Sequence, residues 1–261
     1  MSDRLILLSN DDGYFREEIR ALFHRLKDLG RVHIVAPDRE KSATSLALTL
    51  RHPLRVQKIR PRVHAVDGTP ADCIFVALQK ILPRPPDLVI SGLNPGPNLG
   101  QQDVHYSGTV AAAVQGTFLG IPSMAVSMIP RPAGSFDLDF AVRVVRDLAV
   151  HILSRGLPKG VTLNVNIPPP PVKGAKITKL GLKFYSPEII ERKDPRGASY
   201  YWIGTGNPRR LGDAASDVQA AYRGYISITP LHADRTHYRA LKGPALKAVA
   251  KAPRLSRAGD L

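Results

Sequence analysis

The 261-residue chain contains a single cysteine, Cys73, and no long apolar run. One cysteine cannot form an intramolecular disulfide or a cysteine-based zinc site, so nothing here requires an oxidising compartment. No stretch approaches the roughly 18 uninterrupted apolar residues of a transmembrane helix. The apolar run at residues 5–8 is too short for a signal-peptide core. We therefore expect a cytoplasmic protein with no membrane partner.

Several nucleotide- and metal-binding motifs are also missing. The sequence has no G-x-G-x-x-G and no G-x-x-x-x-G-K-[ST], which argues against dinucleotide binding and P-loop chemistry. It has no H-E-x-x-H and no G-x-S-x-G, the motifs of zinc peptidases and of α/β-hydrolase nucleophiles. Any catalytic site must therefore be built from other residue patterns.

Acidic residues are scarce beside basic ones, with 22 Asp and Glu against 37 Lys and Arg, a net charge of +15. This excess predicts attraction to polyanions but does not specify a fold. Residues 239–261 carry six Lys or Arg and one Asp, and they form either a loosely docked helix or a disordered basic tail. No aromatic residue follows Tyr238 on which a base could stack, so a nucleic-acid partner is open but not favoured.

The first half of the chain alternates short apolar runs with helical patterns. Strands are expected at residues 5–8, 32–36, 88–91 and 123–127, and helices at 17–29, 70–82 and 109–119. This alternation predicts an α/β fold, a Rossmann-like and mostly parallel sheet with helices on both faces. Ligands of such sheets bind beyond the carboxyl ends of the strands.

The second half changes in texture. Ser135 is expected to cap a helix over residues 137–154 that Gly156 ends, and a strand follows at 161–167. The runs at 175–186, 199–204 and 220–230 predict a β-ribbon, with a polar loop at 192–197, that serves as an oligomerisation arm. We divide the chain into a core at 1–130 and a remainder at 131–261, expected to form one continuous unit.

Polar residues follow three of the expected strands. Asp11 and Asp12 come directly after the first strand, and adjacent carboxylates with oxygen ligands suit Mg²⁺ or Mn²⁺. The alternative is that this Asp-Asp-Gly sequence only forms an Asx turn. Ser42 follows the second strand and is either a ligand, a phosphate contact or a cap. Asn94 ends the third strand, where its amide oxygen can face the two aspartates.

A glycine-rich loop at 96–100 precedes Ser107, Gly108 and Thr109, which open an alanine-rich helix. The amides, hydroxyls and dipole of such a helix start attract an anion, although Ser107 as a plain cap is the alternative. By contrast, Thr69, Pro70 and Asp72 have the pattern of a structural capping box, and Cys73 that of an inert core thiol.

Together these segments resemble the SurE (survival protein E) family of metal-dependent nucleotidases. The matching text occurs in family order over residues 5–236: LLSNDDG, VAPDREKS, LTL, DGTPADC, SGLNPGPNLG, YSGTVAAA and GYISITPLHADRT. The resemblance implies hydrolysis of nucleoside 5′- and 3′-monophosphates, with exopolyphosphatase activity on polyphosphate in some members. It also implies a homodimer or homotetramer. By motif, one Mg²⁺ or Mn²⁺ would be held by Asp11, Asp12, Ser42 and Asn94. Phosphate would be received by Asn98, Ser107, Gly108 and Thr109.

Asp11 and Asp12 are the expected catalytic residues, by one of two routes. Either a metal-bound water attacks phosphorus, or an aspartate attacks it directly to form an aspartyl phosphate. The sequence departs from the family at YFREEI, where Glu17 and Glu18 replace a Pro-Gly turn and predict a more helical, mobile loop. It also departs at QQDVH, which leaves the place of Asp103 open, and at Ala43, where Gly is common. A non-catalytic polyanion-binding or phospho-responsive protein with a degenerate site is the alternative function.

Overall fold

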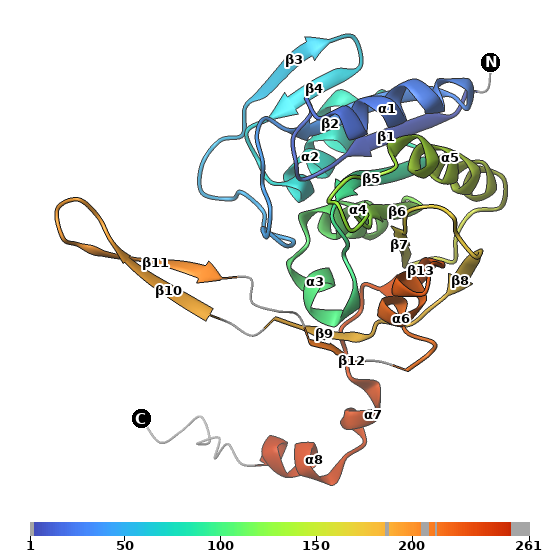
Figure 1. The fold of residues 1–261 in the computed structure, drawn as a ribbon. Helices are drawn as coiled ribbons and strands as arrows, with labels where there is room; N and C mark the ends of the chain where they lie inside the picture. Colours follow the sequence, from blue (N-terminus) through green and yellow to red (C-terminus); the bar gives the residue numbers. More distant parts are fainter. Residues whose placement is uncertain (1–2, 186–187, 205–208, 212, 252–261) are drawn as a thin grey trace, which may run out of the picture.

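The computed structural model describes residues 3–185, 188–204, 209–211 and 213–251, and its centre is a nine-stranded sheet. The strand order is β3-β4-β2-β1-β5-β6-β7-β13-β8 (Figure 1). The strands are β1 (Leu5–Ser9), β2 (Arg31–Pro37), β3 (Val56–Arg60), β4 (Val63–Val66), β5 (Leu88–Pro95), β6 (Ser123–Met128), β7 (Val161–Ile167), β8 (Ala175–Ile177) and β13 (Ile226–His232). Strands β4, β2, β1, β5, β6 and β7 run parallel, which confirms the predicted fold class.

Helices cover both faces of the sheet. Ile6 and Leu8 of β1 pack into one core with α1 (Glu17–Arg25) and α5 (Leu138–Arg155). Leu5 and Leu7, which point the opposite way along the strand, pack with α2 (Pro70–Val76) and α4 (Gly108–Phe118). Burial on both faces explains why the central strands are continuously apolar instead of alternating.

Helix ends are set mostly by the expected residues. Thr69 and Asp72 form a capping box at the start of α2, and Cys73 is fully buried behind it. Gly156, with φ of +74°, ends α5 as predicted. The predicted Ser135 cap is wrong: α5 begins after Asp137, whose carboxylate accepts the amide hydrogen of Phe140 at 3.0 Å.

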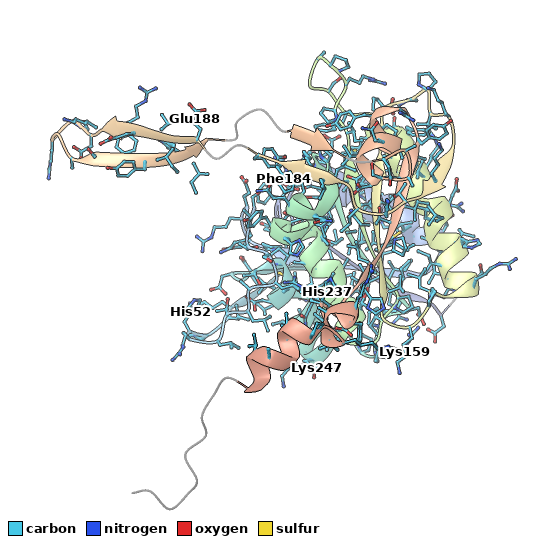
Figure 2. The ribbon with its side chains drawn as sticks, turned by 90° about the horizontal axis from the view of Figure 1, so that it is seen from below. His52, Lys159, Phe184, Glu188, His237 and Lys247 are labelled. Carbon is cyan, nitrogen blue, oxygen red and sulfur yellow. The ribbon has the colours of Figure 1, made fainter. Side chains whose placement is uncertain are left out.

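The predicted β-ribbon is correct only in part. Strands β10 (Glu188–Lys193) and β11 (Ser199–Gly204) form an antiparallel pair, here called the arm, and the predicted polar loop is shortened to a turn after Lys193. Figure 2 shows Glu188 at the base of the arm, which projects away from the body. Short strands β9 (Leu182–Phe184) and β12 (Arg209–Leu211) pair beside it.

The last part of the expected ribbon belongs to the body. Residues 220–222 lie in α6 (Asp217–Tyr222), which Ser216 caps, and β13 lies inside the central sheet between β7 and β8. The correction has a simple cause: β13 reads like a ribbon strand locally, but its partner β7 lies more than fifty residues earlier in the chain.

Short helical elements complete the described chain. They are η1 (Leu26–Asp28), a π-helical turn η2 (Ala77–Ile81), α3 (Gly100–Tyr106), α7 (Tyr238–Leu241) and α8 (Pro244–Lys251). The segment from Arg239 to Lys251 thus contains two short helices separated by residues 242–243, and residues 252–261 lie outside the described part. Figure 1 shows α7 and α8 extending away from the sheet. None of the helices in the described part has the length and hydrophobicity needed to span a bilayer.

Candidate active site

The carboxyl ends of β1 and β5 bring the predicted metal ligands to one edge of the sheet. The two strands pair in parallel, with Ser9 of β1 opposite Ser91 of β5. Asp11 and Asp12 follow β1, and Asn94 is the second-to-last residue of β5. The parallel register therefore places the aspartates and Asn94 at the edge where ligands of doubly wound folds bind.

The turn after β1 does not use either aspartate. The side chain of Asn10 closes it, donating to the carbonyl of Gly13 at 2.9 Å and accepting the Gly13 amide at 3.1 Å. Gly13 has φ of +107°, a conformation that side chains rarely adopt, which explains the glycine at this position. The Asx-turn alternative thus accounts for Asn10 and leaves the carboxylates of Asp11 and Asp12 for another role.

Asp11 is buried against the start of α4. The hydroxyl of Thr109 donates to its Oδ1 at 2.5 Å. At Gly108, a Cβ atom would lie 2.8 Å from the Cβ of Asp11, so only glycine lets the helix approach this closely. Burial raises the pKa of Asp11, and the Thr109 hydrogen bond acts in the opposite direction.

Asp12 carries a carboxylate oxygen, Oδ2, that is buried without a hydrogen-bond partner in the described structure. Burial and the neighbouring charge of Asp11 raise the pKa of Asp12 to about 7. A divalent cation would stabilise this pair of adjacent carboxylates, one buried and one partly buried.

The loop after β2 lies against Asp11. The amide of Lys41 donates to the Asp11 carbonyl at 2.7 Å. Ser42 is exposed, and its hydroxyl donates to Glu40 at 2.8 Å. The side-chain amide of Asn94 donates to the Gly96 carbonyl at 2.7 Å.

The donor types fit a hard cation. Two carboxylates, an amide oxygen and a hydroxyl are oxygen ligands of the kind that Mg²⁺ and Mn²⁺ prefer. Over the described ranges, no group of three or more His, Cys, Asp or Glu side chains forms a metal cluster. The candidate set therefore depends on the neutral donors Ser42 and Asn94 as well as on the aspartate pair.

The predicted phosphate residues are held firmly. Ser107 caps α4, accepting the amide of Val110 at 3.1 Å. Asn98 donates from its side chain to Ser127 at 2.8 Å. The structure thus uses the Val110 amide for the Ser107 cap and places the Thr109 hydroxyl on Asp11.

Two asparagines of β7 were missed by the sequence analysis. Asn164 and Asn166 donate to the carbonyl of Asn98 at 2.9 and 3.0 Å, and the Asn98 amide donates back to Asn166 at 2.9 Å. Both are fully buried. The signal was available, because two asparagines inside an otherwise apolar strand need a buried polar partner.

Comparison with known proteins places this arrangement in a family. The family model described as survival protein SurE matches residues 6–187. The chain belongs to the SurE family. The 5′-nucleotidase SurE of Geobacter metallireducens is 46% identical over 242 residues, covering 90% of this chain and 94% of that protein. The 5′-nucleotidase SurE of Geobacter sulfurreducens is 46% identical over 239 residues, covering 90% of each. The crystal structure of the SurE protein from Aquifex aeolicus has a TM-score of 0.81 at 41% identity, covering 94% of this chain and 99% of that one.

Of the three departures from the SurE pattern, two lie in helices, and the third, Ala43, has a positive φ of +57°. Glu17 and Glu18 form the first turn of α1, where their charge complements the helix dipole, so the helical part of that expectation is confirmed. The QQDVH segment lies within α3, and Asp103 is buried there beside Lys183.

A cavity of about 430 Å³ opens beside Ser107. Its apolar wall runs along α4 and β13, and its polar residues include His105 and His232. The larger apolar lining residues include Val104, Val110, Val114, Phe118, Leu180 and Leu231. The cavity has the size and the mixed lining of a small-ligand site.

Proposed function

We propose that this SurE-family protein is a divalent-metal-dependent 5′-nucleotidase that hydrolyses nucleoside monophosphates to nucleoside and phosphate. The observation that carries the proposal is the buried, unpartnered Oδ2 of Asp12 beside Asp11, at the amino-terminal end of α4. The SurE relatives are named 5′-nucleotidases, which supports the same activity here.

Asp11, Asp12, Ser42 and Asn94 would hold one Mg²⁺ or Mn²⁺. When bound, the cation supplies charge neutralisation for the phosphate and a water of lowered pKa. Thr109 orients Asp11 by donating to its Oδ1, and this bond opposes the rise in the Asp11 pKa that burial causes. Asp12, whose Oδ2 no other side chain engages in the described structure, would use one oxygen for the cation and the other as proton acceptor or nucleophile.

The start of α4 binds the phosphate group. The positive end of the α4 helix dipole stabilises the negative charge that develops on the phosphoryl oxygens. Gly108 allows this helix end to lie directly against Asp11, so cation and anion sites adjoin. Asn98 and Ser107 fix the segment that leads into the helix.

The cavity beside Ser107 supports a nucleoside substrate. A purine or pyrimidine needs an apolar surface, and the Val110, Val114 and Leu231 side chains supply one next to the phosphate site. The proposal also includes activity on 3′-monophosphates and on polyphosphate. It further includes a homodimeric or homotetrameric state and a location in the cytoplasm.

The test uses the purified full chain with AMP and p-nitrophenyl phosphate, with and without Mn²⁺. We expect metal-dependent phosphate release that EDTA abolishes and added Mn²⁺ restores. Asp12→Asn should abolish hydrolysis and metal binding while circular dichroism stays unchanged. An exposed acidic residue on α5, Asp139, gives the control, since Asp139→Asn should leave the rate unchanged. Polyphosphate binding without hydrolysis would instead favour the non-catalytic alternative.

A further inference from the structure

Lys183 and Asp103 form an ion pair in the interior. The Lys183 Nζ lies 2.6 Å from the Asp103 Oδ2, and the two side chains are only 3% and 7% exposed. Lysine and aspartate are rarely buried to this degree unless they are paired. Lys183 belongs to β9, just before the arm, and Asp103 belongs to α3, so the pair joins two elements 80 residues apart.

Asp103 makes a hydrogen bond to each end of the segment from Leu99 to Ser107, which joins the predicted phosphate residues. Its Oδ2 accepts the amide of Leu99 at 3.1 Å, directly after Asn98. Its backbone carbonyl accepts the amide of Ser107 at 2.9 Å. Asp103 therefore links the residue that follows Asn98 to Ser107.

A second set of bonds ties α3 to the same root of the arm. Asp217, fully buried at the start of α6, accepts the amides of Gly100 at 2.8 Å and of Gly181 at 2.7 Å. The amide of Gln101 donates to the Gly181 carbonyl at 2.9 Å. The amide of Tyr185 donates to the side chain of Gln102 at 3.0 Å. Residues 181–185 thus form the base on which α3 rests.

We propose that Lys183 is a positioning residue for the phosphate site, acting through Asp103 and α3, so that the root of the arm sets the geometry of Asn98 and Ser107. The inference rests on the proposed nucleotidase function. The lysine stays charged in the interior: burial alone would lower its pKa, but the hydrogen bonds and charges of Asp103 and Tyr185 together outweigh this and raise it. The positive charge of Lys183 is needed because the Asp103 Oδ2 accepts the Leu99 amide while it is ionised and buried. The lysine neutralises the charge on that same oxygen.

Three variants separate positioning from general support of the fold. Lys183→Met removes the charge and should lower kcat/KM for AMP about tenfold to a hundredfold, because small displacements at a reacting centre have effects of this size. Affinity for Mn²⁺ should stay unchanged, since its ligands lie on β1, β5 and the loop after β2. Lys183→Arg keeps the charge and should restore most of the activity.

The double variant Lys183→Met with Asp103→Leu is the decisive one. Replacing both members of a buried ion pair by apolar side chains often restores stability. The Leu99 amide would still lack its acceptor, so we expect the melting temperature to recover while kcat/KM stays low. Recovery of activity together with stability would overturn the proposal and leave the pair a purely structural role.

A matched control breaks another ion pair. Arg146 of α5 lies 2.6 Å from Asp28, on the α1 and α5 face of the sheet, and Arg146→Met should leave kcat/KM unchanged. A similar loss of activity in that control would contradict a specific role for Lys183. If the wild-type protein does not hydrolyse AMP, the proposed function fails. The inference is then decided by calorimetry with inorganic phosphate and Mn²⁺: it holds if Lys183→Met weakens phosphate binding, and falls if binding is unchanged or undetectable in the wild type.

Discussion

Asp11 and Asp12 are neighbours in sequence, but their carboxylates have different surroundings. Asp11 is fixed by the Thr109 hydroxyl, whereas the Asp12 Oδ2 is buried without a partner in the described structure. Thr109 is a predicted phosphate contact, and its hydroxyl donates to Asp11, a proposed metal ligand, so it could also act as an outer support of the metal site. A support of Asp11 and a direct phosphate contact predict different effects on Mn²⁺ affinity and on KM.

Thr109→Val should weaken Mn²⁺ binding by about tenfold or more and lower kcat with it, because loss of a partner that orients a ligand has effects of this size. Thr109→Ser keeps the hydroxyl and is the control. Titration calorimetry with Mn²⁺ and steady-state assays with AMP check both variants. An unchanged Mn²⁺ affinity with a raised KM would return Thr109 to the role of phosphate contact.

His33 of β2 makes the stability of the fold depend on pH. It is buried, and both ring nitrogens lack a hydrogen-bond partner within the described residues. Burial, with the positive charges of Arg62 and Arg31 and the nearby His64, lowers its pKa to about 4. The unfolded chain, with a histidine pKa near 6.5, therefore binds a proton more readily than the folded chain between these values.

Above pH 6.5 His33 is neutral in both the folded and the unfolded chain and adds no pH dependence to the free energy of unfolding. As the pH falls toward 4, the unfolded chain gains a proton that the folded chain does not, so the free energy of unfolding decreases. His33→Leu should remove about 2 kcal/mol of the decrease in unfolding free energy between pH 7 and pH 4.5. Urea unfolding at the two pH values measures it, and His151→Leu, an exposed histidine on α5, is the control. An equal decrease in wild type and His33→Leu would show that other groups cause the acid sensitivity.

At the scale of elements, local patterns sufficed where one helix or strand contains its own signal. The apolar runs of β1, β2, β5 and β6 and the capping box of α2 were predictable because burial on both faces and cap chemistry are local. α3 was not, because its stability comes from Asp103, Lys183 and Asp217, which are distant in sequence. β13 was misassigned for the same reason, since its residue pattern is that of any strand and does not indicate which strand it pairs with.

The site divides in the same way. The aspartate pair, Asn94 and the start of α4 follow from strand ends and a helix start, both visible in the sequence. The asparagines of β7 and the buried ion pair depend on contacts across the sheet. They become visible only when the chain is folded.

The arm presents apolar side chains that nothing in the described chain covers. Tyr201, Trp202 and Ile203 of β11 are 62%, 63% and 81% exposed. A two-stranded ribbon of this kind is marginal alone and gains stability against another surface. Trp202→Glu with Ile203→Glu should therefore shift a dimer or larger assembly toward monomer in light scattering. A wild-type protein that is already monomeric at micromolar concentration would refute the intersubunit role.

At the scale of the whole molecule, the positive charge is unevenly distributed. Residues 239–261 contribute six positive charges and one negative, so +5 of the net +15 lies there. Figure 2 shows Lys247 on α8, which with α7 forms the described part of this segment. None of the candidate metal or phosphate residues lies beyond residue 109.

Truncation before Arg239 tests what this charge does. We expect AMP hydrolysis to stay unchanged, because the sheet edge, α4 and the α3 support are all retained. We also expect polyphosphate binding to keep its salt dependence, whose slope counts the phosphates neutralised, because the segment has no aromatic residue after Tyr238 for stacking. A flattened slope would show that the segment recruits long polyanions. Loss of AMP hydrolysis with the oligomer intact would have a different meaning: residues beyond 238 would complete the active site, and the sheet edge would hold only part of it.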